Sequence, residues 1–381
     1  MEMTVRKTDL LRELQLFQGI VERKNTIPIL ANVLIEANGD GKVDLVATDL
    51  EVGLRSRCVA SVAKGGALTI PAKKLYEIVR ALPDTDIRIQ SGAKGAVKVA
   101  AEKFNSRMQT LPREDFPTLP DATAETRSVT LPRASLREMV GKTQFAITGE
   151  DTRYFLNGAL FVLGAETMTL VATDGHRLAL VSSPRYRAEA SGESPGDENA
   201  EGEFESILPK KTLWELTRLL SDGEEDVRYT CGENHLFFDV DGRQLISRVI
   251  DAKFPAYQRV IPKTNDKTIE FERDRLTSAI KRVALLSSER SRAVKFHIAQ
   301  GAVDVMSSSP EVGEATETLA VDYDGELVEI CFNAQYVLDF LGAADSENVQ
   351  LAFKDAMSQA VMTPVGSDGC DYTYVIMPMR V

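Results

Sequence analysis

The chain carries an internal repeat, and a repeat of domain length restricts the fold more than any other feature of the sequence. The segment "LVATDLEVGLRS", which includes Val46 to Asp49, returns as "LVATDGHRLALV", where the same four residues are Val171 to Asp174. The two copies lie 125 residues apart, which is close to the usual length of one domain. The sequence therefore predicts a protein built from copies of one domain.

Further segments recur with a larger shift. "IPAKKLYEIVRAL" starts at Ile70 and returns as "LPKKTLWELTRLL" from Leu208, while "LPREDFP" ends at Pro117 and returns as "VIDAKFP" ending at Pro255. Both shifts are 138 residues, so the second copy must contain an insertion after Asp174. The insertion is the acidic segment 187–205, which has almost no apolar residues and is therefore predicted to be a solvated, mobile loop.

A fainter third copy completes the plan. "RDRLTSAIKRVALL" stands where a first helix is expected, "MSSSPEVGEATETL" where the Thr-Asp strand is expected, and "FNAQYVLDFLGAA" where a second helix is expected. We predict an α+β protein of three repeated domains, at 1–122, 128–255 and 256–381. Each domain reads as strand and helix, three strands, strand and helix, and three strands.

Five of the six predicted helices have apolar residues at helical spacing, which should face a core. Thr8 is the expected cap of the first helix. The predicted inner faces are Leu10, Leu14, Phe17 and Val21; Leu75, Ile78, Val79 and Leu82; Leu136, Met139, Val140 and Thr143; Leu213, Leu216 and Leu220; and Leu276, Ile280 and Val283. "ELQLF" at 13–17 looks like a short docking motif, and Trp214 could stack on a base, but core packing is the favoured interpretation of both.

Composition restricts the class of protein. The 381 residues are 43% hydrophobic and 27% charged, as in ordinary globular proteins. The N-terminus has no apolar run after its charges, and no stretch approaches 18 apolar residues, so we expect a cytosolic protein without a membrane partner. Four cysteines lie far apart and three histidines do not cluster, which predicts no metal site, no cofactor and no disulfide framework.

Charge is distributed unevenly along the chain. A net charge of −12 argues against nucleic acid as a partner, yet Lys and Arg outnumber Asp and Glu nearly two to one across the six predicted helices. This sorting marks the helices as the anion-facing surface. The alternative is that these are ordinary solvated helix faces rich in Lys.

The motifs of common enzymes are missing from the sequence. There is no G-x-x-x-x-G-K-[ST] phosphate loop, no H-E-x-x-H and no EF-hand loop. His176, with Asp174 and a serine, could in principle form a hydrolase triad, but residues two apart on a strand do not thereby make the required hydrogen bonds. We therefore expect a non-catalytic protein and keep a metal-free hydrolase centred on His176 as the disfavoured alternative.

Six motifs, some of which overlap the repeated segments above, carry a resemblance to a known family. They are "TIPIL" (26–30), "TLPREDFP" (110–117), "RYFLNG" (153–158), "VATDGHRLA" (171–179), "KFPAY" (253–257) and "YVIMPMRV" (374–381). Over nearly its whole length the chain resembles the bacterial sliding clamps, the beta subunit of DNA polymerase III. The resemblance implies a clamp fold with two inward helices per domain and antiparallel sheets outside. It also implies a homodimer, joined head to tail into a ring around duplex DNA.

Such a ring implies a processivity factor for DNA replication, with weak, sequence-independent phosphate contacts, because topology rather than affinity retains the DNA. By position in the family we assign DNA contacts to Lys24, Arg153, Lys210 and Lys211. By helix placement we add Lys73, Lys74, Arg80, Arg137 and Lys142, for which an ordinary surface location is the alternative.

The resemblance also implies a pocket between domains two and three that binds short peptides of DNA polymerase, the clamp loader and repair proteins. The matching residues are Leu156, Thr173, Gly175, His176, Arg177, Leu178, Pro255, Val260, Val375 and Met377, flanked by Tyr154, Pro378, Met379 and Arg380. Methionine suits a site that accepts several partners, because its side chain adapts to different shapes.

Opposite charges suggest where two copies would meet. Glu311, Glu314 and Glu317 lie in the third copy, whereas Lys98, Lys103 and Arg107 lie on the last strands of the first. We predict that these two groups face each other at the head-to-tail interface. The competing hypothesis for the whole chain is a scaffold or adaptor of the same fold that does not encircle DNA.

Overall fold

The computed structural model describes residues 1–21, 26–38, 41–92, 95–122, 127–149, 152–185, 204–366 and 369–380. Most of the acidic segment predicted to be a mobile loop lies outside these residues, as does Lys24. The chain forms two compact units, residues 1–134 with 211–249 and residues 135–210 with 250–381. The division between these units passes through the middle sequence repeat.

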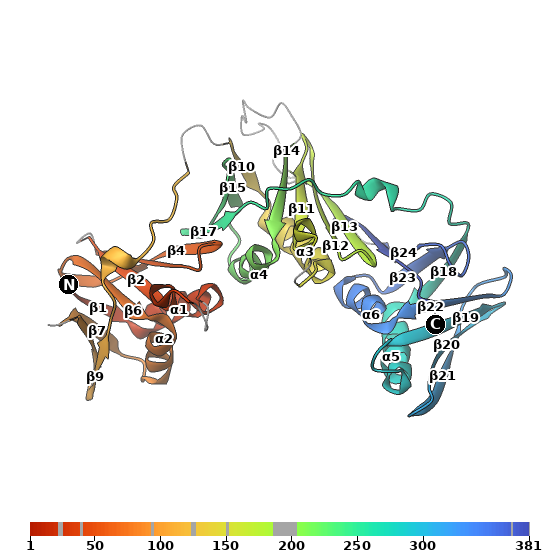
Figure 1. The fold of residues 1–381 in the computed structure, drawn as a ribbon, viewed down its shortest axis with the longest axis horizontal. Coiled ribbons are helices and arrows are strands. Elements are labelled where there is room, and N and C mark those ends of the chain that lie inside the picture. Colours follow the sequence, from red (N-terminus) through yellow and green to blue (C-terminus); the bar gives the residue numbers. More distant parts are fainter. Residues whose placement is uncertain are drawn as a thin grey trace. The chain divides into compact units, whose positions relative to one another are not determined.

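The first unit contains two antiparallel sheets (Figure 1). The five-stranded sheet has the order β5 (Ser61–Lys64), β1 (Glu2–Arg6), β7 (Asp86–Ser91), β8 (Ala96–Ala101) and β9 (Phe104–Gln109). The eight-stranded sheet has the order β10 (Arg127–Leu131), β15 (Val227–Cys231), β16 (His235–Val240), β17 (Arg243–Arg248), β4 (Val52–Val59), β3 (Lys42–Thr48), β2 (Asn32–Ala37) and β6 (Gly66–Pro71).

The second unit follows the same plan. Its eight-stranded sheet has the order β14 (Phe204–Pro209), β11 (Gly158–Leu163), β12 (Thr167–Thr173), β13 (Arg177–Pro184), β25 (Asp371–Ile376), β24 (Ala360–Val365), β23 (Asn348–Phe353) and β18 (Lys267–Glu272). Its four-stranded sheet has the order β21 (Gly313–Ala320), β20 (Ala302–Ser309), β19 (Ala293–Ala299) and β22 (Val328–Asn333).

Six α-helices and several short 3-10 turns accompany these strands in the described parts of the chain. The helices are α1 (Lys7–Ile20), α2 (Ala72–Ala81), α3 (Arg133–Thr143), α4 (Lys210–Leu219), α5 (Arg273–Val283) and α6 (Ala334–Ala343). The 3-10 turns are Pro28–Ala31, Arg113–Asp115, Gln144–Ala146, Tyr154–Leu156, Tyr257–Arg259 and Ala284–Leu286. The predicted element order is confirmed in all three repeats, with β5 as one additional short strand.

The helical periodicity identified the buried faces well. The predicted inner residues of α3 and α5 are buried, as are those of α4 and the following Leu220, and packing rather than docking explains "ELQLF" because Leu14 and Phe17 are buried. Leu10, Leu75, Val79 and Leu82 are also buried, whereas Val21 and Ile78 are only half-buried. The predicted cap was wrong, because α1 begins at Lys7, one residue before Thr8, and its N-cap is Arg6, without a capping side-chain bond.

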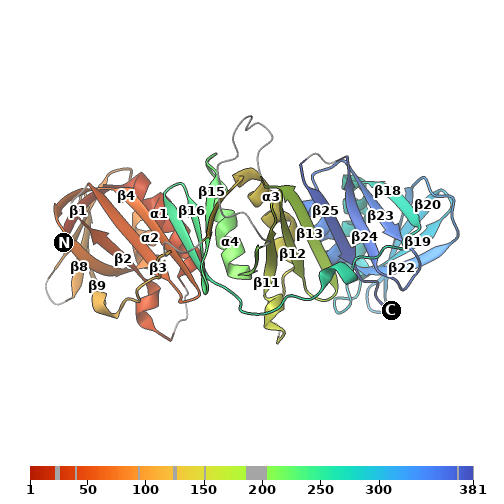
Figure 2. The ribbon, with the colours of Figure 1, turned by 90° about the horizontal axis from the view of Figure 1, so that it is seen from above.

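Both large sheets continue across a boundary between sequence repeats. Strand β17 of the second repeat pairs with β4 of the first, and β13 of the second pairs with β25 of the third. Figure 2 shows β13 and β25 lying side by side. Because these pairings are backbone hydrogen bonds, neighbouring repeats form one continuous sheet. The chain therefore has three repeated domains with antiparallel sheets, joined through their strands.

Candidate functional sites

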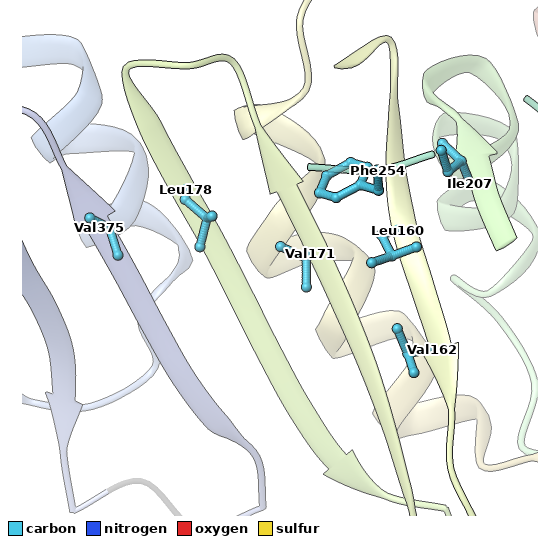
Figure 3. Close-up of a cluster of buried hydrophobic side chains, with 7 residues drawn as sticks. All are labelled: Leu160, Val162, Val171, Leu178, Ile207, Phe254 and Val375. Atoms are coloured by element: carbon cyan, nitrogen blue, oxygen red, sulfur yellow. The ribbon is translucent and has the colours of Figure 1, made fainter. Parts of the chain in front are cut away.

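A cluster of buried apolar side chains covers one face of the sheet shared by the second and third repeats (Figure 3). Adjacent strands supply the cluster, since Leu178 of β13 and Val375 of β25 are cross-strand neighbours. Phe254, from the segment that links the two repeats, packs on the same cluster. Its seven members are Leu160, Val162, Val171, Leu178, Ile207, Phe254 and Val375.

Partly buried apolar residues surround this cluster, among them Phe155, Leu180, Tyr257, Ile261 and Val361. Side chains alternate between the faces of a strand, so the strand residues of this cluster, together with Leu180 and Val361, lie on the opposite face from the residues that pack on the helices. Tyr374 is an example of the helix-facing set, because its hydroxyl donates to the Tyr336 carbonyl of α6 at 2.9 Å. The cluster therefore forms a buried apolar layer on the face away from α6, with the partly buried residues packed against it.

The turn between β12 and β13 borders this cluster and is fixed by its own hydrogen bonds. The Asp174 carboxylate accepts from the backbone N–H groups of His176 and Arg177 at 2.9 and 3.1 Å. The Thr173 hydroxyl donates to the Arg177 carbonyl at 2.6 Å. Gly175 has φ +87°, a left-handed conformation that glycine adopts without the strain a Cβ would add.

The C-terminal segment runs beside this turn. The Met377 N–H donates to the His176 carbonyl at 2.9 Å, and the Met379 N–H donates to the Cys331 carbonyl at 2.7 Å. Pro378 is half-buried and Arg380 is exposed. The structure thus brings together the turn and the C-terminal segment, which the sequence separates by about 200 residues.

Other residues predicted for the pocket lie nearby at different depths. Leu156 is buried, whereas Tyr154 is 58% exposed and its ring meets the Phe155 ring edge-on at 6.2 Å. Val260 is exposed, and the Pro255 carbonyl accepts from the N–H of Tyr257 in the linking segment. An exposed aromatic beside an apolar floor is the arrangement expected of a site that anchors a peptide side chain.

Arg177 does not line the pocket surface as predicted. Its side chain is only 9% exposed; Nε donates to Asp174 at 2.9 Å, Nη1 to Asp339 at 2.5 Å, and Nη2 to the Phe145 carbonyl at 2.6 Å. The guanidinium also lies 4.3 Å from the centre of the Tyr336 ring. Because Asp339 and Tyr336 belong to α6, Arg177 connects the turn to the third repeat.

The basic residues of α2 are the most accessible of the predicted DNA contacts. Lys73 and Lys74 are exposed and share one acidic neighbour, Glu77, at 3.9 and 2.9 Å. Arg80 is exposed and lies over the Tyr76 ring at 5.5 Å. Exposed ion pairs of this kind contribute about 0 to 1 kcal/mol, so a phosphate can displace them readily.

Lys210 and Lys211 are held more firmly. Lys210 Nζ donates to the carbonyls of Ile147 and Thr148 at 2.9 and 3.3 Å. Burial, together with the charge of Arg177, lowers the pKa of Lys210. Lys211 pairs with Asp49 and remains 26% exposed. Both ammonium groups therefore have local acceptors before any phosphate approaches.

Lys142 was predicted on an outer helix face, and the structure corrects this placement. It is buried and pairs with Glu138 of its own helix and with Asp345 at 3.1 Å, while the Cys370 sulfur lies 3.3 Å away. Burial opposes its charge, but hydrogen bonds to Glu138 and Asp345 outweigh this and raise the pKa of Lys142. Burial also disfavours the charged form of the Cys370 thiol, and this raises the pKa of Cys370 to about 11. Lys142 is a structural cation, removed from contact with DNA.

Two arginines from the same set differ in location. Arg137 is exposed on α3. Arg153 lies against the turn, because a Cβ added at Gly175 would stand 3.1 Å from its Nη1. Arg153 therefore lies at the turn that borders the apolar cluster. It also remains one of the predicted DNA contacts.

The charges predicted for a dimer interface lie on or beside strands that end two sheets. Lys98, Lys103 and Arg107 are exposed on β8, its following turn and β9, and β9 is the last strand of its sheet. Glu311 and Glu314 are exposed at the start of β21, which also ends a sheet. Glu317 already pairs with Arg282 of its own chain at 2.6 Å.

Comparison with known proteins decides the family. The profiles for the N-terminal, central and C-terminal domains of the DNA polymerase III beta subunit match residues 1–120, 130–256 and 258–380. The chain belongs to the DNA polymerase III beta subunit family. Beta sliding clamps of Pseudomonas putida and Escherichia coli K12 are 37% and 36% identical, over all of both chains in each comparison.

Solved structures of beta subunits agree with this assignment. The DNA polymerase sliding clamp of Pseudomonas aeruginosa superposes with a TM-score of 0.89 at 34% identity, and the beta sliding clamp of Caulobacter crescentus with 0.88 at 36%. Both comparisons cover each chain completely. Beta subunits are non-catalytic, so this chain is not an enzyme. Among its described residues, no helix of this beta subunit is long and apolar enough to cross a membrane.

Sequence reasoning missed three features of this beta subunit. Asp339 and Asp345 bind Arg177 and Lys142 from the third repeat, and nothing local in either sequence segment indicates those partners. Trp214 was interpreted as core packing, yet it is 54% exposed. Its position between Lys211 and Arg218, on the side of α4 away from Leu213 and Leu216, could have indicated that exposure.

Proposed function

We propose that this beta subunit is a sliding clamp that encircles duplex DNA and tethers replication and repair proteins to it. Family membership over the whole chain carries the proposal. As a processivity factor it performs no chemistry, and its effect is to keep a polymerase on the same DNA molecule. We place it in the cytoplasm, where it would meet its DNA and the polymerase.

The apolar cluster at the junction of the second and third repeats is the proposed peptide site. Leu178, Val375 and Phe254 supply an apolar floor, while exposed Tyr154 and Val260 stand beside it. A peptide anchored by one or two apolar side chains should depend on a few central contacts, each contributing about 2 kcal/mol or more when truncated. The proposed partners are the polymerase catalytic subunit, the clamp loader and repair proteins.

Two solved relatives support a ligand site in the family. One structure is a sliding clamp from Pseudomonas aeruginosa bound to griselimycin. Another is the Caulobacter crescentus clamp with polyethylene glycol bound to a putative beta-motif tethering region. We assign the corresponding role in this chain to the cluster and its bordering turn, including Arg153.

DNA contacts are proposed for the basic residues that the structure leaves accessible, together with Lys24, which lies outside the described residues. Weak phosphate contacts suit a protein that slides, because many strong contacts would add drag and salt sensitivity. The accessible and half-buried members are Lys73, Lys74, Arg80, Arg137, Arg153, Lys210 and Lys211.

Ring closure is proposed to occur between the first domain of one copy and the third domain of another, with domains at 1–122, 128–255 and 256–381. End strands present unpaired backbone groups, and β9 and β21 carry opposite charges. Exposed charge pairs contribute little, so apolar contacts must supply most of the dimer stability. The proposed pairs join the basic residues of one copy to the acidic residues of the other: Lys98, Lys103 and Arg107 face Glu311, Glu314 and Glu317. Of these, Glu317 also pairs with Arg282 of its own chain.

Native mass and retention on closed circular DNA test this function together. A clamp should give a dimer at micromolar concentration and should co-elute with circular duplex after a clamp loader acts. A monomer that is never retained would favour the non-encircling scaffold. A turnover lost in His176→Ala would be required to revive the hydrolase alternative.

A further inference from the structure

Trp214 is the single tryptophan of the chain, and it stands on the accessible side of α4. On the opposite side of this helix, Leu213, Leu216 and Leu219 are buried. The indole itself is 54% exposed. Tryptophan is the residue with the largest apolar surface to lose from water, and exposed tryptophan commonly marks a binding surface.

Two cations flank the indole along the helix. Lys211 lies three residues before Trp214 and Arg218 four residues after it, so all three share one helix face. Each cation is tied to the C-terminal half of α1: Lys211 donates to the Ile20 carbonyl at 3.3 Å and Arg218 to the Gln15 carbonyl at 2.6 Å. The face is therefore ordered before any ligand arrives.

Each of these cations already has a countercharge on the same chain. Lys211 pairs with Asp49, and Arg218 pairs with Glu215 at 2.9 Å. An ammonium has three N–H donors and a guanidinium five, and the two side chains remain 26% and 35% exposed. Arg218 therefore keeps donors for a phosphate oxygen, whereas a phosphate at Lys211 competes with the acceptors that this ammonium already has.

The turn that holds Asp49 adds a strained apolar residue beside this helix. Leu50 has φ +80° and is 49% exposed. The matching turn of the second repeat has Gly175 at this position, with φ +87°. A leucine in this conformation costs about 1–2 kcal/mol of stability.

An indole with flanking cations fits one class of nucleic acid. The faces of bases inside a duplex are covered by their neighbours, whereas single strands leave them free to stack on aromatic side chains. The cations match the phosphates on either side of such a base. We propose that Trp214 stacks on an unpaired base of single-stranded DNA, while Lys211 and Arg218 contact the flanking phosphates. This inference rests on the proposed function only in that the clamp meets DNA.

Fluorescence tests the contact directly, because Trp214 is the single tryptophan. Oligothymidylate added at low salt should quench the emission with the same isotherm that a labelled oligonucleotide gives by anisotropy. It should also shield the indole from acrylamide. A duplex of similar length can approach Lys211 but has its base faces covered, so it should quench the emission much less and should not shield the indole from acrylamide. Unchanged emission at saturating oligothymidylate, or equal quenching by the duplex, would overturn the proposal.

Variants separate stacking from structure, with anisotropy as the readout. Trp214→Ala should weaken oligothymidylate binding by about 5- to 150-fold, the range for loss of one stacked base, and Trp214→Phe should restore most of it. Leu327→Ala removes another exposed apolar side chain, 61% exposed, and should bind normally. Wild-type affinity in Trp214→Ala, or a loss in Trp214→Phe as large as in Trp214→Ala, would refute stacking.

The two proposals fail in different ways. Trp214→Ala should still be retained on closed circular duplex, because encirclement does not require this contact. Failure of the wild-type protein to be retained would instead count against the clamp function, while the oligothymidylate titration would remain readable. Loss of duplex retention by Trp214→Ala, with its dimer mass and circular dichroism intact, would contradict the assignment to single strands.

Discussion

Replacing Gly175 by alanine should damage the proposed peptide site more than it damages the fold. Gly175 has φ +87°, and an added Cβ would stand 3.1 Å from Nη1 of Arg153. The left-handed conformation costs a residue with a Cβ about 1–2 kcal/mol. The arginine is flexible at its tip, so relief of the contact should cost little stability but should displace Arg153 from the turn.

Gly301 provides a matched control within the same unit. It has φ +75°, and a Cβ there would meet nothing within 4 Å. Gly301→Ala should therefore lose the same ~1–2 kcal/mol of unfolding free energy, measured by denaturant titration, without disturbing any side chain.

Peptide affinity should separate the two variants. Truncation of a central contact costs about 2 kcal/mol of binding free energy, or about thirtyfold in Kd. Displacement of such a contact should cost only part of that amount. Gly175→Ala should therefore weaken a labelled clamp-binding peptide by about tenfold in anisotropy, and Gly301→Ala should leave it unchanged. Equal peptide affinities in the two variants would refute the placement of the pocket at this turn.

Three further perturbations address the other proposed surfaces. Alanine at Lys210 and Lys211 should weaken binding to every duplex sequence equally and lower the salt slope by up to about 0.9 per lost contact; a marked sequence preference in the double variant would contradict this. Glutamate at Lys103 and Arg107 should weaken the dimer in sedimentation equilibrium, and an unchanged dissociation constant would rule out the interface. Deleting Met377–Val381 should abolish peptide binding and leave the dimer intact, whereas near-normal peptide affinity would move the pocket elsewhere.

The sequence predicted the local features of the fold because periodicity records which face of an element is buried. Leu136, Met139 and Val140 recur at helical spacing, and all three are buried in α3. Thr8 shows a limit of the same approach. A residue suited to capping does not fix the start of a helix when the preceding strand β1 leads directly into it.

Side chains that depend on distant partners could not be predicted in this way. Lys142 occupies an outer position by helical spacing, yet Asp345 and Cys370 enclose it from about 200 residues away. Arg177 is another charged residue held by a distant partner, because it forms an ion pair with Asp339 of α6. An ion pair between repeats leaves no periodic signal in either segment, so a charged residue that the pattern places in solvent can be buried.

The pocket residues were located through the resemblance and by an unusual composition at the chain's end. A mobile tail would be expected to be polar, yet Val375 to Met379 are all apolar. The structure places Val375 in β25 beside Leu178 and leaves Met377 hydrogen-bonded to His176. The apolar composition therefore predicted that the C-terminal segment is buried. Which elements cover it could be seen only from the pairing of β13 with β25.

Release from linearised DNA tests the central claim most directly. The protein is loaded on nicked circular duplex, isolated with it by gel filtration, and the DNA is then cut once with a restriction enzyme. A clamp held by topology should stay on the circle at moderate salt and leave the linear molecule by sliding off its ends. Equal retention on circular and linear DNA, or loss from both at the same rate, would contradict encirclement.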